Sequence, residues 1–417
     1  MTRLRAARLA ATRVRRGARA GRAVITGSAG LLAIGALSAA TVVAAGPASA
    51  GTSIMQLRSH GLINYEPRFH AVSRTAAAAA PRTTLPGGLP VFTARQTDPR
   101  NGHVFHYTMV GKNPKATQTR QSTTVATKLI PLKIVLADGT AHNPAKTNRC
   151  DSVPALTRTV KSPVFVKQDW SFHGTHVGTT QYADAFRRAE FWKYTQPSGL
   201  NPRYHVYLSL ARLRVITVHI PTSASAKGKG SCSGEIAINI HWLTDYLTTT
   251  LLPKLAAHKL VGPATFPLFL VTNTVEYAGS PIDCCILGYH GKFTTARGNT
   301  QTFGVADYEN SGFFPRARNL RNVESVSHEV AEWMDDPLGN NPTPQWGDVG
   351  QVSGCQANLE VGDPLTGTTL SDPVGGFTYS LQELAFASWF YHQSPSIGLN
   401  GWYSNNGTFT TAAARCT

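Results

Sequence analysis

Short apolar stretches that end at glycine, proline or asparagine constrain the fold of this chain most strongly. From Val104 onward, stretches such as TKLIPLKIVLADGT and TFPLFLVTNTVEY have the length and the β-branched and aromatic content of strands. Residues 180–192 carry apolar side chains at helical spacing, and residues 234–258 begin like a strand and continue as an amphipathic helix. This mixture predicts an α+β domain with a mixed sheet over residues 101–417. We also expect strands at 103–111, two strands within 203–220, a helix at 380–393 and a terminal strand or hairpin at 401–410.

The first hundred residues have a different composition. Residues 1–22 contain eight arginines and no acidic residue, residues 29–45 are apolar, and Ala48-Ser49-Ala50 forms a cleavage signal. Residues 1–50 are therefore predicted to be a secretory signal peptide, with the export route left open by Arg15-Arg16. Residues 51–100, rich in Ala, Pro, Thr and Arg, have the low complexity of a linker or a propeptide-like extension. We expect a secreted, extracellular protein without a transmembrane anchor, because no other apolar run approaches the roughly 20 residues that span a bilayer.

The net charge of the chain is +17, of which the eight arginines of the signal peptide contribute +8, leaving +9. The basic residues are scattered, as in FPRARNLRN, and form no stripe interleaved with aromatic residues. This pattern predicts no nucleic-acid partner. It favours a solvated basic surface, and electrostatic association with an anionic cell wall is the alternative.

The chain contains six cysteines, an even number that in an exported protein indicates disulfide bonds. Their spacing does not suit a zinc ribbon, so we do not expect them to bind a metal. Because a vicinal bridge strains the backbone, the adjacent Cys284 and Cys285 are expected to pair with two separate partners. The other four are Cys150, Cys232, Cys355 and Cys416.

Residues 321–335 (RNVESVSHEVAEWMD) have apolar side chains at the spacing of an amphipathic helix. Pro337 is expected to end this helix, since the residue before a proline avoids the helical region. His328 and Glu332 are four residues apart and therefore lie one turn apart on one face. Glu329 follows His328 directly and can reach a water molecule beside the same site.

This arrangement has the form of the zinc-protease signature H-E-x-x-H with glutamate in place of the second histidine. A carboxylate oxygen is an acceptable zinc ligand, so His328 and Glu332 are candidate metal ligands and Glu329 is the candidate catalytic carboxylate. Zinc is the expected metal, and the added carboxylate also suits manganese or iron. The alternative is an ordinary helix whose His and Glu side chains are solvated.

A catalytic zinc site needs a third protein ligand. Glu360, in the segment NLEVGDP, is the first candidate, and Asp363 is its partner or an alternative ligand. Asp335 or Asp336 could orient His328 through its free ring nitrogen. His290, between glycines in GYHGKF, is a further candidate catalytic residue that could bind substrate or stabilise an oxyanion; the alternative is a polar loop histidine.

Residues 173–179 (HGTHVGT) resemble the histidine segment of subtilisin-type serine proteases. That fold places its serine element after the histidine. The only similar string here, Gly51-Thr52-Ser53-Ile54-Met55, precedes the histidine. A serine protease is therefore not expected.

The segment SHEVAEWMDDP, followed by Trp346 and LEVGD, resembles a pattern of exported bacterial zincin-like proteins with an HExxE motif. It is also distantly similar to the plant phosphate-induced (exordium-type) family. Residues 162–192 and 266–291 are similar to two further segments of the bacterial group. The resemblance implies a zincin-like fold, with His328 and Glu332 as metal ligands, Glu329 as the catalytic carboxylate, and Glu360 and Asp363 as the trailing acidic pair. Residues 333–335 and the longer insert 339–357 depart from the pattern.

Together these observations predict a secreted metal-dependent hydrolase. The expected activity is that of a zinc metallopeptidase that acts on a peptide or protein substrate, with Glu329 activating water. The alternative is a non-catalytic extracellular or cell-wall-associated protein on the same fold.

Overall fold

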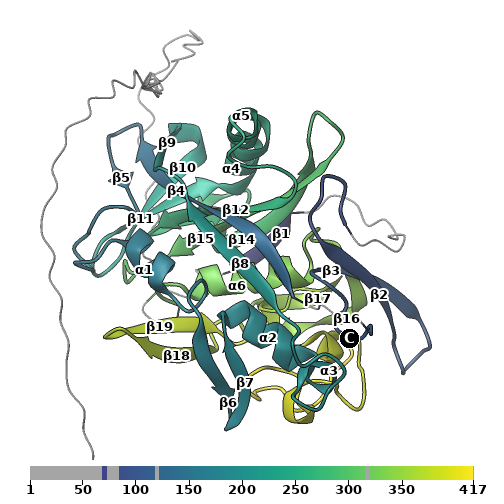
Figure 1. Cartoon of the computed structure of the whole chain (residues 1–417). Helices are drawn as coiled ribbons and strands as arrows, with labels where there is room; N and C mark the ends of the chain where they lie inside the picture. The colour runs from purple at the N-terminus through teal and green to yellow at the C-terminus, as the bar shows by residue number, and fades with distance from the viewer. Residues whose placement is uncertain (1–67, 73–83, 118–121, 315–319, 417) are drawn as a thin grey trace, which may run out of the picture. The chain divides into compact units, whose positions relative to one another are not determined.

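The computed structural model describes residues 68–72, 84–117, 122–314 and 320–416. The predicted signal peptide, residues 1–50, lies outside the described residues, as does most of segment 51–83. The described residues form an α+β fold built on a large mixed sheet, which confirms the predicted α+β class and the mixed sheet (Figure 1). None of the described helices is long and apolar enough to cross a membrane.

The central sheet has 11 strands in the order β10-β11-β13-β14-β15-β12-β4-β5, with β1 beside β14 and with β8 and β9 beside β4. Strands β4, β12 and β15 run parallel, whereas β14 is antiparallel to both β13 and β15. The strand bounds are β1 Arg68–Val72, β4 Thr123–Leu136, β5 Ala141–His142, β8 Val206–Arg212, β9 Ile216–Ile220, β10 Ser225–Lys229, β11 Gly234–Asn239, β12 Thr265–Thr272, β13 Thr274–Tyr277, β14 Cys284–Thr294 and β15 Thr300–Tyr308.

Strand β12 shows how the sheet separates two apolar cores. Leu268 and Leu270 belong to one core, and Phe269 and Val271 belong to the other. This follows from the strand period, because successive side chains point to opposite faces. Figure 1 shows α4 and α5 on one side of the sheet and α6 and α2 on the other. The helix bounds are α1 Ala155–Lys161, α2 Tyr182–Glu190, α3 Trp192–Thr195, α4 Ile240–Tyr246, α5 Leu252–Ala257, α6 Glu324–Asp335 and α7 Ala387–Phe390, with a π-helical turn Leu247–Leu251 between α4 and α5.

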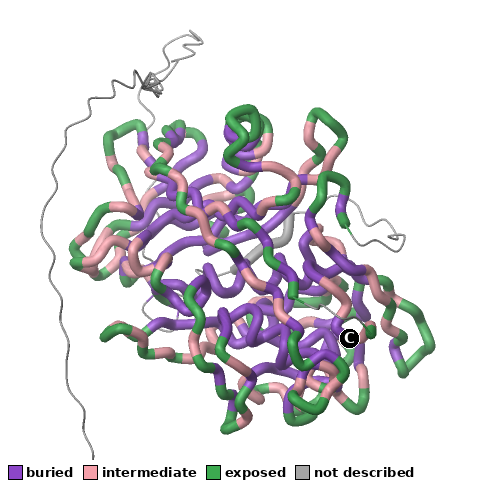
Figure 2. The backbone as a smooth tube through the Cα atoms, viewed as in Figure 1, coloured by how far each residue is buried: buried purple, intermediate pink, exposed green. Residues whose placement is uncertain are grey.

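Four two-stranded hairpins of the described residues pack on the side of the sheet that carries α6 and α2. The hairpin of β16 and β17 covers most of the insert 339–357, which lies between α6 and Glu360. Figure 2 shows buried backbone through the sheet and α6, and exposed backbone at the hairpin tips and outer loops. The hairpin strands are β2 Val91–Thr97 with β3 Val104–Val110, β6 Gln168–Phe172 with β7 Thr175–Thr180, β16 Pro342–Val349 with β17 Val352–Asn358, and β18 Thr369–Val374 with β19 Phe377–Gln382.

Helix α6 is buried along its whole length. It packs against β14 and β15 of the sheet and against β19. The helix ends two residues before Pro337, as predicted. The sequence predicted burial of an apolar face only. In the structure the polar face is buried too, because the segment around Gly362 lies against it.

Other predicted elements agree with the structure in part. Helix α2, strands β8 and β9, and the strand-to-helix segment from β11 to α5 are confirmed. The helix predicted at 380–393 is wrong over most of its length, because β19 extends into it by pairing with β18 and only the short α7 is helical. The strand or hairpin predicted at 401–410 is wrong, because the structure assigns no strand there; the segment is a loop with an isolated bridge between Ala385 and Ser404 and a 2.8 Å hydrogen bond from the Tyr403 N–H to the Phe409 carbonyl oxygen. Leu85, Leu89 and Val91 are buried in the main core, so the core extends before the expected boundary at residue 101.

The structure contains three disulfide bonds, Cys150–Cys232, Cys355–Cys416 and Cys284–Cys285. The expectation that Cys284 and Cys285 have separate partners is therefore wrong. The fold places the other four cysteines next to one another in pairs, which leaves the two adjacent cysteines to bond to each other.

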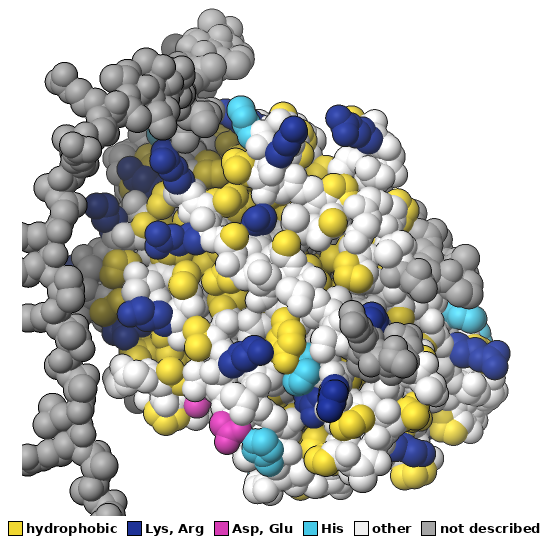
Figure 3. Space-filling view, viewed as in Figure 1, with side chains coloured by type: hydrophobic (Ala, Val, Ile, Leu, Met, Phe, Trp, Pro, Cys, Tyr) yellow, Lys and Arg dark blue, Asp and Glu magenta, His cyan; other side chains and the backbone are white. Residues whose placement is uncertain are grey.

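Lysine and arginine side chains lie singly over the face shown in Figure 3, where acidic side chains are few. This agrees with the scattered basic residues of the sequence. On this face the basic side chains do not gather into a continuous stripe.

Candidate metal centre

Three side chains that suit a metal ion meet at the buried polar face of α6. His328 and Glu332 come from successive turns of the helix, and Asp363 begins the 3-10 turn Asp363–Leu365. His328 Nε2 lies 3.0 Å from Glu332 Oε1 and 3.6 Å from Asp363 Oδ1. One ligand atom from each residue lies within 4.8 Å of the others. This spacing allows a single ion to contact all three, since zinc binds nitrogen and oxygen ligands at about 2.0–2.2 Å.

A second group, His290, Glu329 and Glu332, overlaps the first through Glu332. His290 Nδ1 lies 3.3 Å from Glu329 Oε2 and 3.8 Å from Glu332 Oε2. The two predicted catalytic residues, His290 and Glu329, thus lie beside the predicted ligands. His328, Glu329 and Glu332 are fully buried, which excludes the alternative of a helix with solvated His and Glu side chains.

His290 is held from both ring nitrogens. Its Nε2 lies 3.0 Å from the Asp336 carbonyl oxygen. A carbonyl can only accept, so Nε2 carries a hydrogen and donates it. Nδ1 faces Glu329, and one proton is therefore shared between the imidazole and this carboxyl group.

Two glycines allow other chain segments to approach α6 closely. A Cβ at Gly362 would lie 2.3 Å from His328 Nδ1, and a Cβ at Gly288 of β14 would lie 2.7 Å from Glu329 Cγ. The Gly362 N–H also donates a 3.0 Å hydrogen bond to Glu332 Oε1. Any side chain at these positions would displace a residue of the site.

Glu360 and Asp363 have different surroundings. Glu360 is buried and accepts a 2.9 Å hydrogen bond from the Asn358 side chain. The structure brings Asp363, rather than Glu360, into the group with His328 and Glu332. Gln351 and Gln356, both from the insert 339–357, donate hydrogen bonds to Asp363. The insert therefore orients a candidate ligand.

The site holds four buried carboxyl groups and two imidazoles. Burial, followed by the charges of Glu332 and Asp363, raises the pKa of Glu329 well above its usual value. Burial likewise raises the pKa values of Glu360 and Asp363. Burial opposes ionisation of Glu332 as well, but His328, His290 and a hydrogen bond with Glu360 together outweigh burial and lower the pKa of this group. A divalent cation would compensate this excess of buried negative charge, so the donor set fits a metal.

Asp335 and Asp336 do not contact the His328 ring in the way that the sequence suggested. Asp335 forms a buried ion pair with Arg187 of α2. The Asp336 carboxylate accepts a 2.7 Å hydrogen bond from the Asn341 N–H. These contacts hold the end of α6 in place.

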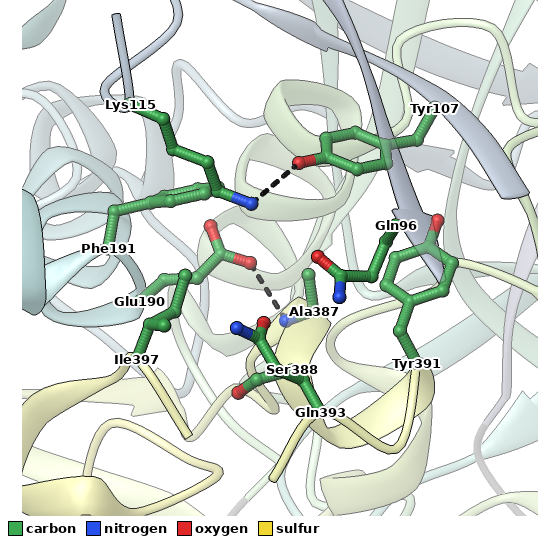
Figure 4. Close-up of a pocket in the computed structure, with 10 residues that line it drawn as sticks. All are labelled: Gln96, Tyr107, Lys115, Glu190, Phe191, Ala387, Ser388, Tyr391, Gln393 and Ile397. Carbon is green, nitrogen blue, oxygen red and sulfur yellow. Dashed lines mark hydrogen bonds between the residues drawn. The ribbon is translucent and has the colours of Figure 1, made fainter. Parts of the chain in front are cut away.

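A small pocket lies near this ion pair (Figure 4). Glu190, buried at its wall, accepts a 2.8 Å hydrogen bond from the Ala387 N–H. Lys115 Nζ lies 3.5 Å from the Tyr107 hydroxyl. The cavity volume is about 10 Å³, which leaves room for roughly one water molecule and excludes a substrate.

The HGTHVGT segment forms the hairpin of β6 and β7. His176 pairs with Asp169 at 2.6 Å, and His173 contacts the Asn406 carbonyl oxygen at 2.7 Å. Both histidines are exposed, and their described hydrogen bonds lead to no serine.

The sequence interpretation missed several residues that shape the site: Gly288, Gly362, Gln351, Gln356 and Arg187. Gly288 and Gly362 lie inside the GYHG and LEVGD segments, so the motifs themselves carried a signal. Arg187 and the two glutamines carried none, because their roles depend on long-range packing. No protein-family model, curated protein or solved structure matches this chain.

Proposed function

We propose that this chain is a metal-dependent hydrolase of zincin type that cleaves peptide bonds. The observation that carries the proposal is the convergence of His328, Glu332 and Asp363 beside Glu329 in one buried, carboxyl-rich site. The α+β fold with α6 packed under a mixed sheet is consistent with a zincin-like architecture. The predicted signal peptide and the disulfides support a location outside the cell.

His328, Glu332 and Asp363 would hold the metal, with Glu360 beside Glu332 as the alternative third ligand. Imidazole and carboxylate donors suit zinc, and the carboxylates also suit manganese or iron. When bound, such an ion supplies Lewis-acid chemistry that polarises a carbonyl group and lowers the pKa of water.

Glu329 would act as the general base that takes a proton from the attacking water and passes it to the leaving amine. Its Oε1 is buried and accepts no hydrogen bond from the described residues, so this oxygen is available for a proton. His290 contacts the other oxygen, Oε2. Because its second nitrogen is bound to the Asp336 carbonyl, His290 is suited to orient Glu329.

Strand β1 supports a peptide as the substrate class. It runs parallel to β14 and pairs with the part of the β14 edge that β13 does not cover. In this pairing Ala71 lies opposite His290. An extended backbone can therefore lie along β14 beside the metal centre, as peptides do when they add a strand to a sheet. β1 falls within the segment 51–100 that the sequence predicts to be a linker or propeptide, so its pairing would compete with a substrate.

Metal analysis and peptide turnover of the purified full-length chain test this function. We expect one equivalent of zinc, manganese or iron in the parent and in Glu329→Gln, and loss of that metal in His328→Ala. Glu329→Gln should lower peptide turnover by about 10²–10⁴-fold with an unchanged fold. A folded parent without bound metal would contradict the proposal.

The second candidate is a non-catalytic extracellular protein in which the metal has a structural role. The burial of the site favours it, since His290, His328, Glu329 and Glu332 are all 0% exposed. Association with an anionic cell wall through the basic surface belongs to this candidate. A chain that binds metal but shows no peptide turnover, even when prolines at positions 70 and 71 displace β1, would support this non-catalytic role.

A further inference from the structure

Three further carboxyl groups converge in a place that shares no residue with the candidate metal centre. Glu235 lies in β11, Asp307 lies in β15, and Glu309 follows β15 directly. One oxygen from each lies within 4.8 Å of the others. The three residues are 1%, 0% and 4% exposed.

Glu235 distinguishes this cluster from an ordinary acidic patch. Both of its carboxyl oxygens are buried, and neither forms a hydrogen bond of good geometry with a described residue; the Ser311 hydroxyl and the Glu309 carboxyl group are its polar neighbours. Asp307 Oδ2 and Glu309 Oε2 are also buried without a donor. Within the described part of the chain, no Lys, Arg or His forms an ion pair with any of the three. These four oxygens form no hydrogen bond of good geometry and have no cationic partner among the described residues, which is costly for a folded protein.

The remaining oxygens are fixed by donors around the cluster. The Thr274 N–H donates to Asp307 Oδ1 at 3.1 Å. Glu309 Oε1 accepts from the Ser311 hydroxyl at 2.7 Å and from the Gly312 N–H at 3.2 Å. Each of these two carboxyl groups therefore has one oxygen held by a donor outside the cluster and one left without a hydrogen bond, which suits a metal ligand oriented by surrounding groups.

We propose that Glu235, Asp307 and Glu309 bind one calcium ion. The donor set contains oxygen only, which selects hard cations over zinc or copper. Calcium binds six to eight oxygens at 2.3–2.6 Å with flexible geometry. Magnesium keeps several waters and needs near-ideal octahedral geometry, which a buried cluster of carboxyl groups does not provide.

The surroundings give the ion a structural role. The loop that contains Cys232 packs against the loop after Glu309. The Cys232 N–H and the Ser233 N–H donate hydrogen bonds of 2.8 and 3.2 Å to the Ser311 carbonyl oxygen. Calcium would tie these two loops to the ends of β11 and β15.

Calcium binding and thermal unfolding of the full-length chain at pH 7 test this site after treatment with a chelator. We expect the parent to bind one equivalent of calcium and its unfolding midpoint to rise when calcium is added. Glu235→Gln should bind calcium at least about 100-fold more weakly and lose the rise. Glu324→Gln changes another buried carboxyl group and should keep both properties, as should Glu332→Gln, which alters only the candidate metal centre.

Two results would overturn the inference. The first is a folded parent that binds no calcium at pH 7, which would mean that protons neutralise the cluster. The second is an equal rise of the unfolding midpoint in the parent and in Glu235→Gln. If Glu235→Gln does not fold, Asp307→Asn takes its place, and the parent measurement alone still decides. Glu332→Gln changes the candidate metal centre but not the calcium cluster. Failure of the calcium site and failure of the proposed hydrolase are therefore separate outcomes.

Discussion

Gly362 lies so close to His328 that a residue with a side chain would not fit at position 362. A Cβ added to Gly362 would lie 2.3 Å from His328 Nδ1 and 2.4 Å from Cε1. The backbone of Gly362 has φ −89° and ψ −35°, a conformation open to every residue. Space beside the imidazole, rather than backbone freedom, therefore requires glycine here. The same residue donates its N–H to Glu332, so one backbone position orients two candidate metal ligands.

Gly362→Ala should accordingly weaken metal binding. The added methyl group must push the His328 ring away from Glu332 and Asp363, and we expect about a 10–100-fold loss of metal affinity. Competition with a chelating dye measures this. Gly262→Ala is the matched control, because a Cβ at Gly262 meets nothing within 4 Å. Equal metal affinity in the two variants would show that the contact does not position His328.

Arg187→Met should destabilise the fold strongly. Arg187 pairs with Asp335, lies 3.4 Å from Glu190 and donates to the Met334 carbonyl oxygen at 2.8 Å, all in the interior. Removing the guanidinium leaves two buried carboxyl groups without a counter-charge, at a cost of about 3–5 kcal/mol in the free energy of unfolding. Urea unfolding measures the loss.

Arg158→Met provides the comparison for that measurement. Arg158 pairs with Asp151 at 2.9 Å, with side chains 21% and 13% exposed. A partly solvated pair contributes about 1 kcal/mol or less. If both variants lose the same stability, the interior pair does not hold the end of α6 as argued. The double variant Arg187→Met/Asp335→Asn should lose less than the sum of the two single changes.

Glu276→Gln should stabilise the protein at neutral pH. Both carboxyl oxygens of Glu276 are buried without a hydrogen bond from the described residues, and burial raises the pKa of this group well above its usual value near 4.5. The folded state therefore keeps the proton at pH values where the unfolded chain has lost it. Stability from this group is full below pH 4.5 and falls as the pH rises toward the folded pKa, by about 1.4 kcal/mol for each unit of difference.

The unfolding midpoint of Glu276→Gln and the parent, measured from pH 5 to pH 8, tests this. The midpoint of the variant should exceed that of the parent by an amount that grows with pH, since glutamine does not ionise. Two curves that stay parallel over this range would contradict the predicted proton uptake.

Prolines at positions 70 and 71 should raise peptide turnover if β1 occupies the substrate edge. These positions lie opposite Tyr289 and His290 of β14. The N–H groups of neighbouring residues in a strand point to opposite sides, so one of the two positions directs its N–H toward β14. Proline has no N–H, and replacing both residues therefore removes one hydrogen-bond donor between β1 and β14. Peptide hydrolysis by this variant is compared with that of a double valine variant, which keeps both N–H groups. Equal turnover in the two would argue against competition by β1.

Much of the local structure could be predicted from the sequence. The spacing of Val323, Val326 and Val330, followed by Pro337, predicted the helix that the structure shows as α6. The placement of His328 and Glu332 on one helical face followed from the same period. The mixture of strand-like and helical segments predicted the α+β class. These features depend on residues a few positions apart, whose relation the backbone period alone determines.

Tertiary structure decided how distant segments meet. Whether Asp363 or Glu360 lies with His328, how Arg187 reaches Asp335, and which cysteines pair all depend on the packing of segments far apart in the chain. The cluster of Glu235, Asp307 and Glu309 carries no local motif at all. It exists because the fold brings residues of β11 and β15 together, although β13 and β14 lie between these two strands in the strand order. Spacing along the chain determines which side chains share a helix face or a strand face. The order and register of the strands determine which of those faces meet, and they depend on the burial of both cores together.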